Sequence, residues 1–210
     1  MPDFNYTWAT TPPIVVYKGN AANAWARKYG SQMLSYVQDY RTGLPDQPEF
    51  TGLSHENINN AEIMCDKFIG ADLEDSEILC VYKLAGSPIA LMILTIFSND
   101  LYISDLIVHP AAEFGGSIMI EFGVNYCAVA ERPPVLTLWA LDETALGSYL
   151  GMGFVSNTEK PRSMTLDLTT PKDKWENFRG QWRYSSSRAP GPMYARAAPT
   201  VPPKPRRVHK

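Results

Sequence analysis

Two features of this sequence could carry chemistry: a pair of glycines before an apolar run, and a lone acid inside an apolar strand. Gly115, Gly116 and Ser117 precede residues 118–130, whose composition predicts a buried helix. Consecutive backbone N–H groups at a helix start, aided by the helix dipole, form a cradle for a pyrophosphate, and glycine permits close approach. As a purely structural feature, the same glycines form a tight turn between a strand and a helix.

Asp105 is the only acid in the strand predicted at residues 101–108. A carboxylate in this position can take a proton from an amine, or it can pair with a neighbouring cation. His109 follows the strand and is either a functional group or an ordinary loop residue. Cys127 falls within the predicted helix at 118–130, where a cysteine is expected to be part of the core.

The cysteines and histidines do not have the spacing of metal ligands, and we expect no metal site. The number of cysteines is odd, so no disulfide framework is implied. These residues are Cys65, Cys80, Cys127, His55, His109 and His209.

The elements that must position these residues alternate in type along the chain. Three β-rich segments in succession predict an antiparallel meander, and the helix and strand that follow predict a β-α-β crossover. The fold class is therefore α/β with a mixed sheet and flanking helices. Strands are expected at 14–17, 77–84, 88–97, 101–108, 135–140, 154–155 and 163–168, and helices at 21–40, 58–68, 118–130 and 143–150.

The composition is that of a soluble globular protein, with 210 residues, a net charge of −3 and 45% hydrophobic residues. This length suits one domain of about 150 to 180 residues with an appendage. The longest apolar run, at 89–97, is too short to span a bilayer, and the N-terminus lacks the pattern of a signal peptide. We expect a protein that is cytoplasmic where it is made.

The charge is unevenly distributed. Residues 180–210 contain seven Lys and Arg and no acid, which leaves 12 cationic and 22 acidic residues, or −10, in residues 1–179. The same basic segment contains six of the 17 prolines, so we expect an extended arm there. The predicted division is an N-terminal arm at 1–13, a domain at 14–170, a docking segment at 171–184 and a Pro-rich basic tail at 185–210.

The docking segment interleaves aromatic and cationic side chains. Such a cluster either stacks on nucleic-acid bases or docks onto its own domain or a partner, and docking is the more common case. The tail at 185–210 resembles a proline-rich ligand that binds a protein partner or an assembly. The aromatic residues are Trp175, Phe178, Trp182 and Tyr184.

The stretch at 101–154 resembles the core of the Gcn5-related N-acetyltransferase (GNAT) superfamily. In that family a strand ending Val-x-Pro leads into a glycine-rich loop and a helix, and a second signature reads Ala-x-x-x-Tyr-x-x-x-Gly-Phe. Asp142 stands where the family often has Asn. The matching residues are Val108-His109-Pro110, Glu113 to Ser117, and Ala145, Tyr149, Gly153 and Phe154, which together cover about a quarter of the chain.

The resemblance implies transfer of an acetyl group from acetyl-coenzyme A to an amine. Backbone groups near Ile107 and Val108 would pair with the pantetheine arm, and the Gly115–Ser117 loop would hold the pyrophosphate. Tyr149 would act as the general acid and Asp105 as the base.

The loop also departs from the family pattern. Ala112 stands where Arg or Gln is expected, and the alternative register puts Glu113 there. An eroded cofactor loop favours a second hypothesis, a non-catalytic protein of the same fold. It would resemble the acetyltransferase-like internal or connector virion proteins of tailed phages and would bind its partners through residues 185–210.

Overall fold

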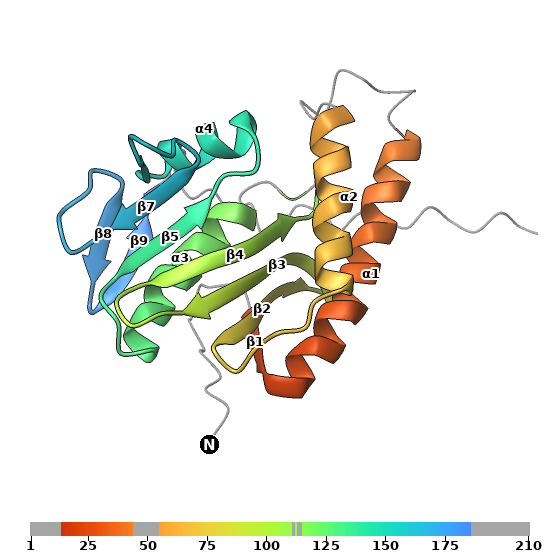
Figure 1. Ribbon diagram of the computed structural model, residues 1–210, viewed down its shortest axis with the longest axis horizontal. Coiled ribbons are helices and arrows are strands. Elements are labelled where there is room, and N and C mark those ends of the chain that lie inside the picture. The colour runs from red at the N-terminus through yellow and green to blue at the C-terminus, as the bar shows by residue number, and fades with distance from the viewer. Residues whose placement is uncertain (1–13, 44–54, 111, 113–114, 186–210) are drawn as a thin grey trace, which may run out of the picture.

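The computed structural model describes residues 14–43, 55–110, 112 and 115–185 (Figure 1). Its centre is a seven-stranded sheet with the strand order β1-β2-β3-β4-β5-β7-β6. The strands are β1 (Ile14–Lys18), β2 (Glu77–Leu84), β3 (Ser87–Ile96), β4 (Leu101–Val108), β5 (Val135–Trp139), β6 (Val155–Ser156) and β7 (Ser163–Asp167). The helices are α1 (Gly19–Gly43), α2 (His55–Ile69), α3 (Gly115–Val129) and α4 (Glu143–Gly151).

The sheet is mixed because one pair of neighbours differs from the others. Strands β1 to β4 form an antiparallel meander, β5 and β7 are antiparallel, and so are β6 and β7. Only β4 and β5 run parallel, as they must when a helix, here α3, carries the chain back across the sheet. The predicted α/β fold class, with its meander and crossover, is confirmed.

Helices cover the two faces of the sheet separately. Along each central strand, alternate side chains point to opposite faces. One set packs under α1 and α2, which stand side by side (Figure 1), and the other packs against α3. The first set includes Leu79, Val81, Leu91, Ile93 and Ile107, and the second includes Cys80, Met92, Leu94, Leu136 and Leu138.

A tight turn explains the hairpin of β2 and β3. Ala85 and Gly86 both have positive φ angles, 50° and 86°, between the paired residues Leu84 and Ser87. Two central residues with positive φ define a type I′ turn, whose twist suits a two-residue hairpin.

The segment at 171–184 forms a second hairpin, made of β8 (Trp175–Phe178) and β9 (Gln181–Tyr184). Its contacts are with the same chain. The Asn125 side chain of α3 donates to the Trp182 carbonyl (2.9 Å) and accepts from the Trp182 N–H (2.8 Å), while Glu121 accepts from the Tyr184 N–H (3.0 Å). Trp175 is 7% exposed and donates its indole N–H to the Met152 carbonyl. Trp175, Trp182 and Tyr184 thus pack the hairpin on the domain, whereas Phe178 is exposed.

The N-terminal arm predicted at 1–13 and nearly all of the tail predicted at 185–210 lie outside the described residues. Within the described part of the chain, no helix combines the length and the apolar character needed to cross a membrane.

We predict that Asn125→Ala destabilises the protein. It removes both hydrogen bonds to Trp182 and leaves buried backbone groups unpaired, at a cost of about 1 to 3 kcal/mol. Chemical denaturation measures the difference. Glu176→Gln, at an exposed position on the same hairpin, is the matched control and should change stability by less than about 0.5 kcal/mol. Equal effects of the two substitutions would contradict this account of how the hairpin is held.

Candidate active site between strands β4 and β5

Strands β4 and β5 separate after a short stretch of pairing. Leu101, Tyr102 and Ile103 pair with residues 136–138, and β4 then continues to Val108 with no described strand on that side. The separation coincides with a bulge in β4. Ile93 of β3 pairs with Asp105 and Leu94 pairs with Ile103, which leaves Ser104 as an extra residue. Because a bulge bends and twists its strand, it turns β4 away from β5 at this point.

A cavity of about 300 Å³ occupies the separation. Four of the residues predicted to act in catalysis or cofactor binding line it: Asp105, Ile107, Val108 and Tyr149. The remaining walls come from α2, from the end of β5 and from α4. Helix α2 contributes Asn60, Ala61 and Met64, and α4 contributes Thr144, Ala145 and Ser148. Leu138, Trp139, Leu141 and Asp142 come from the end of β5 and the residues after it, and β4 also contributes Ile103, Ser104 and Leu106.

Asp105 faces the side of the sheet that α2 covers. Its carboxylate forms an ion pair with Lys67 of α2 at 3.1 Å, and its side chain is 17% exposed. Burial raises the pKa of Asp105 above that of a free aspartate, and the ammonium of Lys67 opposes this shift. The result is a carboxylate that is more basic than usual.

Tyr149 belongs to the opposite side, where it packs against the α3 layer and the ring of Phe154, with 5.4 Å between ring centroids. Burial, together with the nearby carboxylate of Asp142, raises the pKa of Tyr149 to about 12. The phenol therefore stays protonated at neutral pH. Asp105 and Tyr149 thus flank the cavity from opposite faces of the sheet.

The three residues at the start of α3 do not line the cavity. Gly115, Gly116 and Ser117 follow the end of β4, and the helix begins at Gly115. A Cβ atom at Gly115 would lie 2.5 Å from a methyl group of Val108, whereas at Gly116 the nearest atom would be 3.8 Å away. Gly115 is thus required by close packing of the helix on the strand, whereas a Cβ atom at Gly116 would be in ordinary van der Waals contact with Val108.

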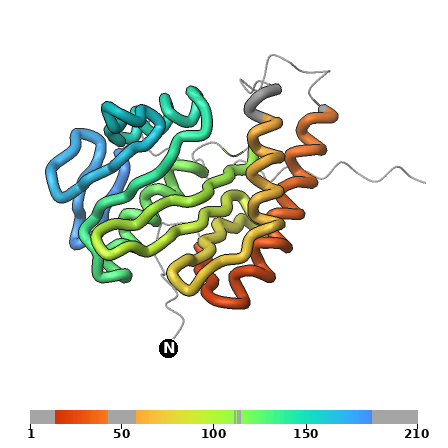
Figure 2. Tube along the Cα trace, viewed as in Figure 1, coloured from red at the N-terminus to blue at the C-terminus, as the bar shows by residue number. Residues whose placement is uncertain are grey.

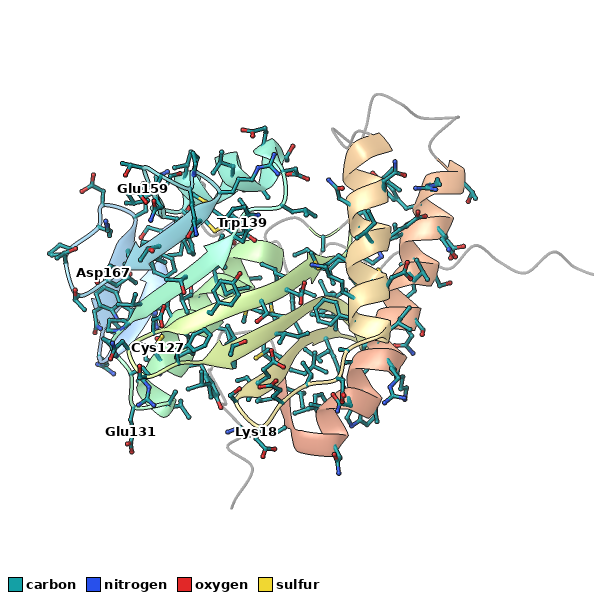
Figure 3. All side chains as sticks on the ribbon, viewed as in Figure 1. Lys18, Cys127, Glu131, Trp139, Glu159 and Asp167 are labelled. Atoms are coloured by element: carbon teal, nitrogen blue, oxygen red, sulfur yellow. The ribbon has the colours of Figure 1, made fainter. Side chains whose placement is uncertain are left out.

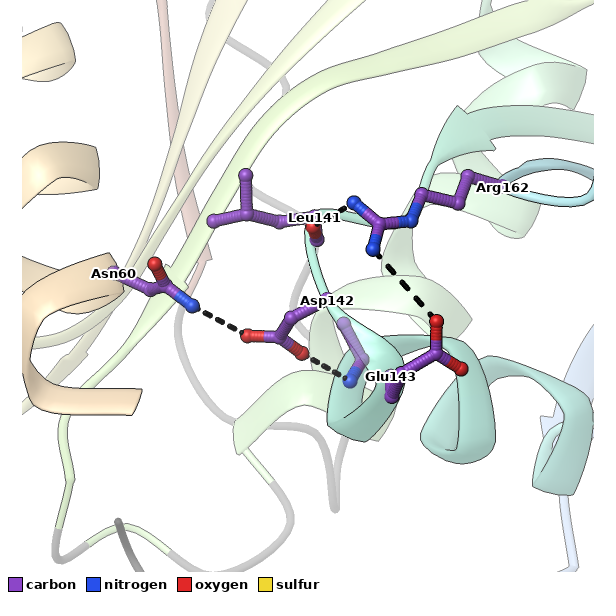
Figure 4. A network of polar contacts seen from close by, with 6 residues as sticks. Asn60, Leu141, Asp142, Glu143 and Arg162 are labelled. Atoms are coloured by element: carbon purple, nitrogen blue, oxygen red, sulfur yellow. Dashed lines mark hydrogen bonds and ion pairs between the residues drawn. The ribbon is translucent and has the colours of Figure 1, made fainter. Parts of the chain in front are cut away.

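A polar bridge joins α2 to the start of α4 at the cavity wall (Figure 4). Asn60 donates from Nδ2 to one oxygen of Asp142 at 2.7 Å, and the other oxygen accepts from the Ala145 N–H at 2.7 Å, which caps α4. Arg162 donates to the carbonyl of Leu141 beside it. The bridging residues Asn60 and Asp142 are 82 positions apart, and Figure 2 shows their segments approaching beyond the end of β5.

Sequence reasoning missed the contribution of α2. Asn60, Ala61 and Met64 had no motif to mark them, although their spacing places them on one side of a helix. Trp139 was also missed. It ends β5 with a 52% exposed side chain (Figure 3), and an exposed tryptophan at a strand end is the signal that could have identified it.

His109 and Cys127 lie elsewhere. The His109 ring packs against Tyr36 of α1, at 5.2 Å between centroids, and burial lowers its pKa. Cys127 is buried in the α3 layer, and burial raises its pKa to about 12, so it is a core residue rather than a nucleophile.

Neither a protein-family model nor a curated protein sequence matches this chain. Several solved structures that it resembles are N-acetyltransferases. A GCN5-related N-acetyltransferase from Rhodopseudomonas palustris is 16% identical, with 76% of this chain and 97% of that one covered and a TM-score of 0.45. A putative acetyltransferase from Exiguobacterium is 17% identical, over 74% and 94% of the two chains, with a TM-score of 0.44.

A further similar structure is the Campylobacter jejuni N-acetyltransferase PseH in complex with acetyl coenzyme A. It is 12% identical, with 74% of this chain and 99% of that one covered and a TM-score of 0.43. At these identities the likeness concerns the fold alone. The strand order and register given above describe the fold of this chain.

We predict opposite effects of alanine at the two glycines. Gly115→Ala forces a Cβ atom against Val108 and should cost about 1 to 3 kcal/mol. Gly116→Ala meets no obstacle and should be neutral or stabilise the helix by up to about 1 kcal/mol. Thermal unfolding of both variants measures this. In a double-mutant cycle, Gly115→Ala should cost less in the Val108→Ala background than in the unaltered protein, and equal costs in the two backgrounds would refute the steric explanation.

Proposed function

We propose that this protein is an acetyl-coenzyme A-dependent N-acetyltransferase whose acceptor is an amine. The observation that carries the proposal is the separation of β4 from β5, with Asp105 and Tyr149 on the walls of the resulting cavity. An extended chain inserted there can pair with the backbone of β4 as an added strand does. The alternative of a non-catalytic assembly protein depends on residues 185–210, which lie almost entirely outside the described part of the chain.

The residues present fit the pantetheine arm better than the phosphates. Ile107 and Val108 line the cavity and would hold the arm through their backbone groups. Gly116 lies at the start of α3, where a phosphate would meet backbone N–H groups, but residues 108–117 contain no Lys or Arg. Phosphate binding would then depend on backbone N–H groups and the helix dipole. We therefore expect weak binding of the phosphate end.

When bound, acetyl-coenzyme A supplies an acetyl group activated as a thioester. Asp105 takes the proton that the acceptor nitrogen must lose, and its raised pKa makes it a stronger base for this task. Tyr149 retains its own proton at neutral pH and offers it to the negative charge that develops as the acyl bond breaks. A phenol with a pKa of about 12 is a weaker acid than free tyrosine, so its main contribution is a hydrogen bond to that charge.

Binding of acetyl-coenzyme A is the first test. At 100 times its Kd, the ligand should stabilise the full chain by roughly 2.7 kcal/mol, measured as a rise in melting temperature. Tyr149→Phe should leave this shift nearly intact and lower kcat by about 100-fold, because only the hydroxyl is lost. The absence of any shift at millimolar acetyl-coenzyme A would refute the proposed function.

The pH dependence of turnover tests the role of Asp105. Lys67→Met removes the cation that lowers the pKa of Asp105, so that pKa, already raised by burial, should rise further. The carboxylate would then gain its proton at a higher pH, and the acid limb of kcat/KM should move upward. Lys67→Arg, which keeps the charge, is the control and should leave the limb near its original pH. An unmoved limb in Lys67→Met would show that Asp105 is not the base.

A further inference from the structure

We propose that the acceptor carries a second cationic group, and that Asp142 binds this group and so determines acceptor specificity. This inference rests on the proposed function, because it concerns the same cavity. The chemical class that it predicts is a diamine, with one nitrogen acetylated and the other held as an ammonium.

The first observation is an imbalance between two carboxylates. Asp105 and Asp142 both line the cavity, yet among the described residues only Asp105 has a cationic partner, Lys67. The two oxygens of Asp142 accept hydrogen bonds from neutral groups, the Ala145 N–H and the Asn60 amide. The cavity lining contains no Lys, Arg or His among the described residues. It therefore presents a carboxylate whose charge no lining side chain compensates.

The second observation is the pattern of side chains along α2. Asn60, which contacts Asp142, and Lys67, which contacts Asp105, are two helical turns apart on one side of α2, or about 10 Å along its axis. Met64 lies between them on the same side and also lines the cavity. Along α2, the contact of Asn60 with Asp142 is thus followed by the apolar side chain of Met64 and then by the contact of Lys67 with Asp105. This sequence of polar, apolar and polar groups matches two amino groups joined by methylenes.

The third point concerns the hydrogen bond from Asn60 to Asp142, whose donor an ammonium of the acceptor would replace. An ammonium donates hydrogen bonds as the Asn60 amide does, but its charge makes the bond to a carboxylate roughly twice as strong. Trp139 lines the same cavity with a half-exposed indole, whose face attracts cations. An anionic acceptor would be repelled by both carboxylates.

Turnover with matched acceptors tests the proposal on the full chain. With acetyl-coenzyme A, kcat/KM for 1,5-diaminopentane should exceed that for n-pentylamine by about tenfold, since the chains differ only in the second ammonium. In Asp142→Asn this preference should fall to about twofold or less through a higher KM for the diamine. Any effect of the lost charge on Tyr149 acts on both amines and cancels in their ratio. Asn caps helices as well as Asp does, so the start of α4 should hold.

Glu143→Gln is the control, because it removes the same charge one residue further on, from a side chain that is 80% exposed. It should leave the preference unchanged. Equal kcat/KM for the two amines in the unaltered protein, or a preference that survives Asp142→Asn, would overturn the inference while leaving acetyl transfer in place.

Calorimetric binding of 1,5-diaminopentane, without acetyl-coenzyme A, separates this inference from the proposed function. Binding that weakens about tenfold in Asp142→Asn would support the cation site even if acetyl-coenzyme A produced no thermal shift, which is the result that refutes the proposed function. A diamine that binds both proteins equally, or neither, would refute the cation site.

Discussion

The structure of the candidate site depends on one constraint, which is how far β4 and β5 remain paired. A strand in the interior of a sheet normally has a partner on each side, because its backbone groups need hydrogen bonds. Here β4 pairs with β3 from Leu101 to Val108, apart from the bulge, but it pairs with β5 only from Leu101 to Ile103. The extra residue Ser104 bends β4 at that point. The cavity is a consequence of this interrupted ladder, and the ladder with β3 holds β4 in place.

The elements around the separation then determine its chemistry. On one side α2 brings Lys67 to Asp105, and on the other α4 brings Tyr149 against the α3 layer. Burial acts on both titratable groups in the same direction, because it disfavours their charged forms and raises both pKa values. Burial thus makes Asp105 a stronger base and Tyr149 a weaker acid than the free side chains. Asp142, between α2 and α4, is the other acidic residue of the cavity lining.

Much of the fold could be predicted because it depends on local patterns. Residues 101–108 match β4 as a strand, and α3 and β5 were placed within a few residues. The site was only partly predictable. Asp105 and Tyr149 were expected to act together, and they do line one cavity. The glycines were expected to serve a ligand, yet Gly115 has a steric reason of its own in Val108. The β8–β9 hairpin was expected only as a docking segment, since its strands are short.

The sequence by itself determined the order of strands and helices, because hydrophobic periodicity and turn residues act over a few neighbouring positions. It also determined which residues could do chemistry. Only the tertiary structure decided that Asn60 meets Asp142 and that Lys67 meets Asp105. Those contacts join segments 82 and 38 residues apart, and they depend on the bend in β4 and on the packing of α2 across the sheet. A local sequence pattern does not encode contacts between such distant segments, because the packing of the whole domain brings them together.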